Sequence, residues 1–231
     1  MTALEAMSRR KFPVKLVIFD CDGVLVDSEP VVNAVVARVL TAEGWAISGA
    51  EADRRFLGMT LPDMVPVIEA QLGRKLPPGW TDRLVTTIKG AMATETVPIP
   101  GGLEALRGVS ALGLPWRIAS NSSHGELNVK FRCIGASDLV AGRLHSFEDV
   151  PQGKPAPDLF LATAAAESVA PENCVVIEDS TTGARAAAAA GMMCLGFVPH
   201  AVPTAMQAAG AFPFASMFDV PALIAAAPRA L

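Results

Sequence analysis

The segment Asp20-Cys21-Asp22-Gly23-Val24 places two acids two residues apart, directly after the apolar run from Val14 to Phe19. In a strand, residues two apart point to the same side, so both carboxylates can face one crevice while Cys21 faces the other way. Gly23 permits a sharp turn and a close approach of backbone or ligand. The pair suits nucleophilic attack and proton transfer, although two acids that cap a loop are the alternative for this motif taken alone.

Three further polar signals follow, each at the end of an expected strand or just before a helix. Ser120-Asn121 offers a hydroxyl followed by helix-start amides, which suits a phosphate oxygen. Lys154 lies on a loop that contains two prolines, and Glu178-Asp179 precede Ser180. Taken singly, the serines read as helix N-caps, the lysine as a solvated charge and the acids as partners of a helix dipole. Their shared position at strand ends favours a single site.

Short, nearly continuous apolar runs predict strands that are buried on both faces, as in a parallel sheet. Such runs occupy residues 14–19, 116–120, 174–178 and 192–197. Helical patterns lie between the later runs: leucines at 103, 106 and 112, a segment opened by Asp158, and an alanine-rich segment from Ser180 to Gly191. The alternation predicts an α/β fold, with a Rossmann-like parallel-sheet core and helices on both faces.

The stretch from about Pro30 to Thr96 breaks this alternation, because it holds helical patterns and prolines but no apolar strand run. We therefore expect an inserted α-helical cap domain at residues 28–97, within a discontinuous core domain formed by residues 1–27 and 98–231. The basic residues Arg9, Arg10 and Lys11 precede the first strand. We expect this N-terminal segment to be a flexible leader, because no signal-peptide core follows it.

The composition argues against several classes of protein. Of the 231 residues, 51% are hydrophobic, and 23 acidic against 19 basic residues give a formal net charge of −4. A sizeable core is expected, and the absence of a basic surplus argues against nucleic acid as a partner. The most apolar stretch, 186–214, is broken by glycines and prolines, so no membrane partner is expected. Four widely spaced cysteines without a CxxC pair argue against a zinc or disulfide framework and fit the cytoplasm. A monomer is the default.

Taken together, the motifs resemble those of the haloacid dehalogenase superfamily, in the branch with a small helical cap after the first motif. This branch contains phosphatases and β-phosphoglucomutase-like enzymes. The resemblance runs from about Val14 to Phe197, and the extension Leu25 to Pro30 is typical of the capped phosphatases. It is carried by the DxDGV motif at Asp20, the pair Ser120-Asn121, the KPAPD lysine Lys154 and the pair Glu178-Asp179.

The resemblance implies a Mg²⁺-dependent phosphatase that hydrolyses a small phosphomonoester, such as a sugar phosphate or similar metabolite, through an aspartyl-phosphate intermediate. Asp20 is then the nucleophile and Asp22 the general acid and base. Because Asp22 is an acid, phosphate esters are favoured over C–halogen and C–P bonds. The implied phosphoryl ligands are Ser120, Asn121 and Lys154. The implied metal ligands are the Asp20 carboxylate, the Asp22 backbone carbonyl and Asp179, with Glu178 direct or one shell further out.

The rival is a β-phosphoglucomutase-like phosphosugar mutase, which shares the cap and all four motifs. Such mutases resemble one another in a cap arginine soon after a Gly-x-Ser/Thr turn. Here the matching turn is Gly58-Met59-Thr60, followed by Leu61 and Pro62, so the arginine is missing and a phosphatase is favoured. Lys89 lies near the place of another mutase lysine and keeps the alternative open. A non-catalytic binding module is the remaining alternative, and the intact acid pair argues against it.

Substrate contacts are less marked in the sequence. Arg54, Arg55 and His124 are candidates, against the alternatives of a solvated helix face for the arginines and a helix-start residue for the histidine. Trp45, Phe56 and Met59 are expected in the core of the cap.

Overall fold

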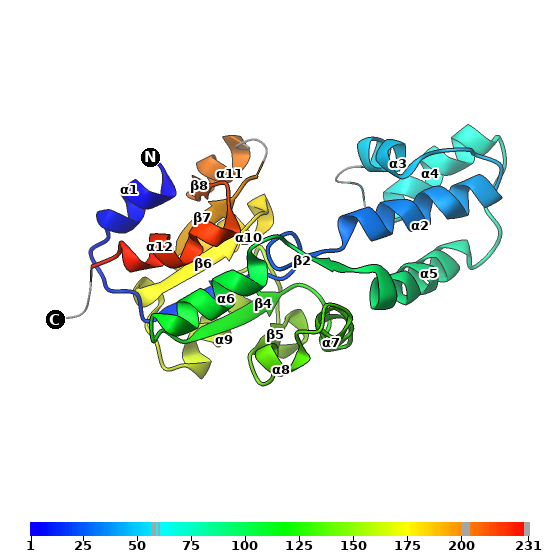
Figure 1. Ribbon diagram of the computed structural model, residues 1–231. Coiled ribbons are helices and arrows are strands. Elements are labelled where there is room, and N and C mark those ends of the chain that lie inside the picture. The colour runs from blue at the N-terminus through cyan, green and yellow to red at the C-terminus, as the bar shows by residue number, and fades with distance from the viewer. Residues whose placement is uncertain (57–58, 60, 200–203, 229–231) are drawn as a thin grey trace. The chain divides into compact units, whose positions relative to one another are not determined.

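The computed structural model describes residues 1–56, 59, 61–199 and 204–228 (Figure 1). The chain divides into two compact units. One consists of Met1–Asp27 with Pro98–Leu231, and the other of Ser28–Val97.

The larger unit contains a six-stranded parallel sheet with the strand order β5-β4-β1-β6-β7-β8. Counted along the chain within this sheet, the order is 3-2-1-4-5-6, as in a Rossmann-type doubly wound fold. The predicted fold class is therefore confirmed. The strands are β1 (Leu16–Phe19), β4 (Trp116–Ser120), β5 (Leu144–Ser146), β6 (Cys174–Glu178), β7 (Met193–Phe197) and β8 (Phe212–Phe214).

Helices cover both faces of this sheet, and alternate residues of β1 explain why (Figure 1). Val17 and Phe19 belong to one buried cluster, whereas Leu16 and Ile18 belong to another. Burying each large apolar side chain contributes about 1.5–3 kcal/mol. The first cluster includes residues of α1 (Ala3–Ser8), α6 (Gly102–Ala111), α7 (His124–Cys133), α8 (Ser137–Val140) and α12 (Val220–Ala225). The second includes residues of α9 (Asp158–Ala166), α10 (Thr181–Ala189) and α11 (Thr204–Ala208). The described part of this unit also has three 3₁₀ turns: η1 (Phe147–Asp149), η2 (Pro171–Asn173) and η3 (Met217–Asp219).

The N-terminal segment differs from the expected flexible leader. Residues Ala3–Ser8 form α1, which opens with a capping box between Thr2 and Glu5 and buries Ala3, Ala6 and Met7. Arg10 donates hydrogen bonds to the backbone carbonyls of Phe12, Glu172 and Cys174. The expectation was wrong because a short apolar face and one buried guanidinium order the segment against the sheet unit.

The smaller unit has its own core between four helices in its described part: α2 (Glu29–Ala42), α3 (Gly49–Phe56), α4 (Leu61–Leu72) and α5 (Trp80–Glu95). As expected, Phe56 is buried and Trp45 packs against this core, but Met59 is 41% exposed and so lies outside it. Gly58 and Thr60 of the mutase-type turn lie outside the described residues. A separate two-stranded sheet consists of β2 (Val26–Asp27) and β3 (Val97–Pro98).

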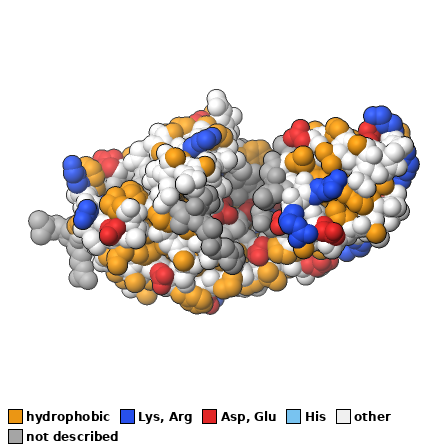
Figure 2. Space-filling model, turned by 90° about the horizontal axis from the view of Figure 1, so that it is seen from above, with side chains coloured by type: hydrophobic (Ala, Val, Ile, Leu, Met, Phe, Trp, Pro, Cys, Tyr) orange, Lys and Arg blue, Asp and Glu red, His pale blue; other side chains and the backbone are white. Residues whose placement is uncertain are grey.

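Two surface features bear on partners. No described helix combines the length and the apolar character that crossing a membrane requires. On the face drawn in Figure 2, Lys and Arg side chains are interspersed with Asp and Glu, and they do not gather into one basic patch.

Candidate active site

The register of the sheet brings the predicted site residues to one edge. Phe19 of β1 pairs with Ile118 of β4 and with Ile177 of β6, so the carboxyl ends of the three strands are level. The direction in which strands are added reverses between β1 and β6, where open α/β sheets bind ligands. Asp20 directly follows β1, Ser120 ends β4 and Glu178 ends β6.

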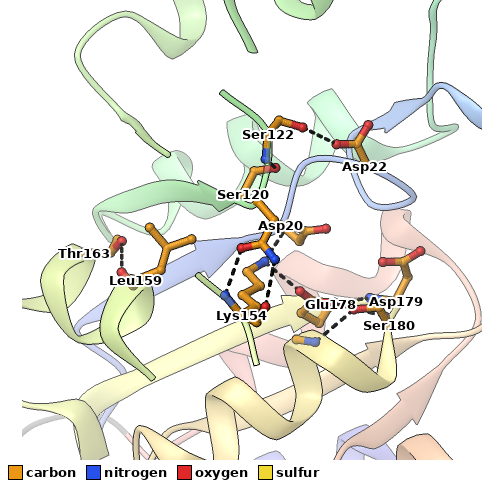
Figure 3. Close-up of polar contacts among 12 residues, drawn as sticks. Asp20, Asp22, Ser120, Ser122, Lys154, Leu159, Thr163, Glu178, Asp179 and Ser180 are labelled. Atoms are coloured by element: carbon orange, nitrogen blue, oxygen red, sulfur yellow. Dashed lines mark hydrogen bonds and ion pairs between the residues drawn. The ribbon is translucent and has the colours of Figure 1, made fainter. Parts of the chain in front are cut away.

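Lys154 forms the centre of this cluster, although it lies 134 residues from Asp20 in the chain (Figure 3). Its Nζ donates to Asp20 Oδ1 at 2.6 Å and to Glu178 Oε1 at 2.7 Å. It also lies 4.7 Å from the centre of the Phe160 ring. Lys154 is only 8% exposed, which excludes the reading of a solvated surface charge.

Burial and neighbouring charge shift the pKa values of this cluster in ways that matter for chemistry. Burial raises the pKa of Asp20 to about 7, with Lys154 opposing the rise and Glu178 adding to it. Burial alone would lower the pKa of Lys154, but the Asp20 and Glu178 carboxylates raise it above its usual value. Lys154 is therefore charged throughout the physiological range, and Asp20 titrates near neutrality.

Glu178 is held by the start of α10. Its Oε2 accepts hydrogen bonds from the backbone N–H groups of Asp179 (3.1 Å) and Ser180 (2.9 Å) and from Ser180 Oγ (2.8 Å). Ser180 Oγ in turn accepts from the Gly183 N–H at 3.0 Å, so Ser180 caps the helix as predicted. A Cβ at Gly183 would lie 1.7 Å from Glu178 Oε1. Glycine at this position gives the carboxylate its space.

Asp20, Glu178 and Asp179 each offer a carboxylate oxygen, and these atoms lie within 4.8 Å of one another. Burial, together with the neighbouring charges of Asp20 and Glu178, raises the pKa of Asp179 to about 8. Gly23 has a φ of +74°, and a Cβ there would lie 1.9 Å from Asp179 Oδ2. Three oxygen donors that repel one another fit a hard divalent cation such as Mg²⁺.

Ser120 and Asn121, at the end of β4, have different surroundings. Ser120 is 2% exposed, and its Oγ accepts from the Ser122 N–H at 3.0 Å. The Asn121 side chain donates to the Lys154 carbonyl and accepts from the Lys154 N–H, both at 2.9 Å. Asn121 therefore fixes the backbone that carries the lysine. Its predicted binding of phosphate stays a prediction.

Asp22 lies beside two residues that the sequence analysis did not single out. Lys130 Nζ is 2.7 Å from both carboxylate oxygens of Asp22, and Ser122 Oγ donates to Oδ2 at 2.9 Å. Figure 3 shows Asp22 and Ser122 directed toward each other. On α7, Lys130 shares a buried stripe with Leu127 and Phe131. A lysine within an apolar helical stripe was the available signal.

The remaining candidates have other partners. His124 Nε2 lies 2.8 Å from Asp149 Oδ1, and the His124 N–H donates to Glu148. Arg54 and Arg55 are exposed on α3, and the Arg55 guanidinium lies 5.0 Å from the centre of the Trp45 ring. Lys89 is exposed on α5. The substrate roles of these residues stay predictions.

Several known proteins are similar to this chain in sequence and in fold. The chain is 27% identical over 192 residues to 6-phosphogluconate phosphatase of Escherichia coli (strain K12), covering 82% of this chain and 86% of that one. A HAD family hydrolase from Deinococcus radiodurans, solved with bound phosphate and sodium, is 32% identical with a TM-score of 0.81, covering 94% and 99%. A conserved haloacid dehalogenase-like protein of unknown function from Agrobacterium tumefaciens is 37% identical with a TM-score of 0.78, covering 92% and 98%.

The model of one hydrolase family matches residues 14–191, which include all four motifs of the site. The match covers well over half of the chain. This chain therefore belongs to the haloacid dehalogenase-like hydrolases.

Proposed function

We propose that the protein is a Mg²⁺-dependent phosphatase that hydrolyses a small phosphomonoester through an aspartyl-phosphate at Asp20. The observation that carries the proposal is the contact of 2.6 Å between Lys154 Nζ and Asp20 Oδ1, at the carboxyl end of β1. A buried carboxylate beside one ammonium and two further acids is suited to attack on a phosphoryl group whose charge is neutralised by cations.

The acid trio supports Mg²⁺ as the cofactor. We propose that the Asp20 carboxylate, the Asp22 backbone carbonyl and Asp179 bind it. Glu178 has its oxygens engaged by Lys154 and the start of α10, which favours a role one shell further out. When bound, the ion supplies positive charge that offsets the repulsion between carboxylates and phosphate.

Each remaining residue then has a chemical role. Asp20 attacks phosphorus, and the bond from phosphorus to the ester oxygen breaks. Asp22 protonates the departing oxygen and afterwards takes a proton from the water that cleaves the aspartyl-phosphate. Ser120 and Lys154 bind the phosphoryl oxygens, with Asn121 fixing the Lys154 backbone.

The substrate class rests on the relatives and on the inserted unit. A relative named 6-phosphogluconate phosphatase supports a phosphorylated sugar or similar metabolite, and the phosphate bound to the Deinococcus relative supports a phosphoryl site. We propose that residues 28–97 act as the cap that selects the substrate, with Arg54 and Arg55 as candidate contacts, and that His124 contributes from the core unit.

The binding partners and the cellular compartment are proposed from the net charge and the cysteines. The net charge of −4 supports a small-molecule partner over nucleic acid. Cys21, Cys174 and Cys194 are buried free thiols, which supports a reducing compartment, the cytoplasm. A membrane partner is not expected, and a monomer remains the default.

The first test is the substitution Asp20→Asn. The altered protein should release no phosphate from sugar phosphates, phosphoglycolate or nucleotides in the presence of Mg²⁺, because an amide is a poor nucleophile. Asp138→Asn, on an exposed position of α8, is the matched control and should keep full activity. Phosphate release by Asp20→Asn at the unaltered rate would exclude Asp20 as the nucleophile.

The same assay separates the phosphatase from the mutase. A phosphatase converts a hexose 1-phosphate to free sugar and phosphate, whereas a mutase returns the 6-phosphate. Isomerised product without phosphate would replace the proposed function with the alternative.

A further inference from the structure

Lys130 is a buried lysine that the roles above do not use. It lies on α7, is 3% exposed, and lies 108 residues from Asp22 in the chain. Its Nζ contacts both oxygens of the Asp22 carboxylate and also donates to Ser122 Oγ at 2.8 Å. An ammonium that bridges both oxygens of one carboxylate restricts its rotation.

Ser122 completes this arrangement and links it to the rest of the sheet edge. Its Oγ donates to Asp22 Oδ2, its N–H donates to Ser120 Oγ, and its carbonyl accepts from Ser146 Oγ at 2.8 Å. The Asp22 side chain is 36% exposed, so water reaches the carboxylate while its direction is set by buried groups. The Asp22 carboxylate is thus oriented by Lys130 and Ser122 and remains accessible to solvent.

We propose that Lys130, together with Ser122, is the positioning residue for the second half of the reaction. This inference rests on the proposed function. In that half, water attacks phosphorus, the bond from phosphorus to Asp20 breaks, and a water proton passes to the Asp22 carboxylate. The products are phosphate, the Asp20 carboxylate and a protonated Asp22, whose proton goes to the leaving oxygen of the next substrate.

The geometry favours this half because Lys130 and Ser122 both donate hydrogen bonds to the Asp22 carboxylate. Hydrogen bonds donated to both oxygens suit the carboxylate form of the side chain, which is the form that accepts a proton from water. A carboxylate that rotates freely would be in position for a smaller share of the time, and a misplaced base costs rate without changing substrate binding. Losing Lys130 should therefore slow hydrolysis of the aspartyl-phosphate more than its formation.

The test is Lys130→Met, which keeps a long unbranched side chain and removes the ammonium. With saturating 4-nitrophenyl phosphate and Mg²⁺, kcat should fall by about 10- to 100-fold, within the range of a lost proton-transfer contribution. KM should fall with it, so that kcat/KM changes far less. Acid-quenched protein should carry a larger phosphorylated fraction by mass spectrometry, and Lys130→Met combined with Asp20→Asn should carry none.

Two further variants separate positioning from folding. Arg132→Met removes a positive charge from an exposed position of the same helix and should match the unaltered protein in kcat and phosphorylated fraction. Ser122→Ala removes only one hydrogen-bond donor to Asp22, so it should lower kcat and raise the phosphorylated fraction by less than Lys130→Met does. This variant provides the test if Lys130→Met does not fold. Thermal unfolding of each variant gives the folded fraction.

The outcomes are distinct. A fall in kcat with more phosphorylated protein supports the inference. An unchanged kcat, or a fall in kcat and kcat/KM together without added phosphorylated protein, overturns it while leaving the phosphatase in place. If the unaltered protein releases no phosphate from any ester, the proposed function fails and the inference fails with it.

Discussion

Lys154 lies between two carboxylates in the interior, and its ammonium offsets only part of their charge. It contacts both Asp20 and Glu178, yet the pKa of Asp20 is still raised to about 7 by burial. A nucleophile with this pKa is partly protonated at neutral pH when no other cation is present. Lys154 therefore limits the rise in the pKa of Asp20, and a bound divalent cation would lower that pKa further, so that Asp20 is ionised at neutral pH.

Replacing this lysine should destabilise the protein in a pH-dependent way. Lys154→Met leaves two buried carboxylates without their partner, and breaking a buried pair in this manner costs about 3–5 kcal/mol. Because Lys154 lowers the pKa of Asp20, that pKa should rise further in the variant. A carboxyl with a raised folded pKa stabilises the fold at low pH and loses that stabilisation as pH rises through the folded value.

The loss of unfolding free energy should accordingly be larger at about pH 8 than at about pH 5, measured by urea denaturation without Mg²⁺. Lys15→Met, at an exposed lysine before β1, is the control and should change stability by less than about 0.5 kcal/mol. An equal loss at both pH values would show that the pair contributes through packing alone.

The residues of the site differ in how far the sequence predicted them. Asp20, Lys154 and Glu178 follow strands or lie in a short motif, and parallel strands place such positions on one edge, where the structure has them. The contact between Lys130 and Asp22 depends instead on how α7 packs against the sheet. No local pattern encodes that distance, so the lysine was visible only as an odd residue in an apolar stripe.

At the scale of elements, Glu178 links the end of β6 to the start of α10 through its side-chain hydrogen bonds. The strand ends in a carboxylate that accepts hydrogen bonds from the N–H groups of Asp179 and Ser180, the two residues that directly precede the helix. Gly183, in the first turn of α10, leaves room for that carboxylate. The helix start therefore fixes the orientation of an acid that contacts Lys154.

This arrangement predicts opposite results for two glycine substitutions. Gly183→Ala should displace Glu178, lower unfolding free energy by about 1–3 kcal/mol through overpacking, and reduce phosphate release at least tenfold. In Gly125→Ala on α7, the new Cβ would meet only Ser123 Oγ at 3.9 Å, so stability should stay level or rise by up to about 1 kcal/mol. Chemical denaturation and the phosphate assay measure both. Full activity in Gly183→Ala would show that the Glu178 orientation is not required.

The two strands of the main sheet that the sequence analysis missed share a physical reason. β5 and β8 are the two edges of the sheet and each has three residues, so neither forms a long apolar run. β8 even contains Pro213, which an edge strand tolerates because it needs fewer ladder hydrogen bonds. By contrast, Trp116–Ser120 and Cys174–Glu178 are central and buried, and the predicted runs match them residue for residue.

For the whole molecule, the net charge of −4 includes a buried set of acids whose ionisation is costly without a cation. The pKa values of Asp20 and Asp179 are raised to about 7 and about 8. Folding then favours protons on these acids, and this contribution to stability is lost as pH rises from the unfolded values through the folded ones. A bound cation needs the same carboxylates deprotonated, so it competes with protons.

Stabilisation by Mg²⁺ should therefore depend on pH. At about pH 8.5 both acids are ionised and repel each other, so Mg²⁺ should raise the unfolding temperature by more than at about pH 6, where it must first displace protons. Removing the ion with EDTA should reverse the increase. Differential scanning calorimetry with and without Mg²⁺ at the two pH values measures the difference directly.

Asp179→Asn tests whether the effect comes from this cluster. The substitution removes one carboxylate from the trio, so the Mg²⁺-dependent increase at high pH should shrink, while stability without metal should rise because one source of repulsion is gone. A Mg²⁺ effect of equal size at both pH values would contradict the cluster as the binding site. So would an effect that persists unchanged in Asp179→Asn, because the ion would then be binding to other acids of the chain.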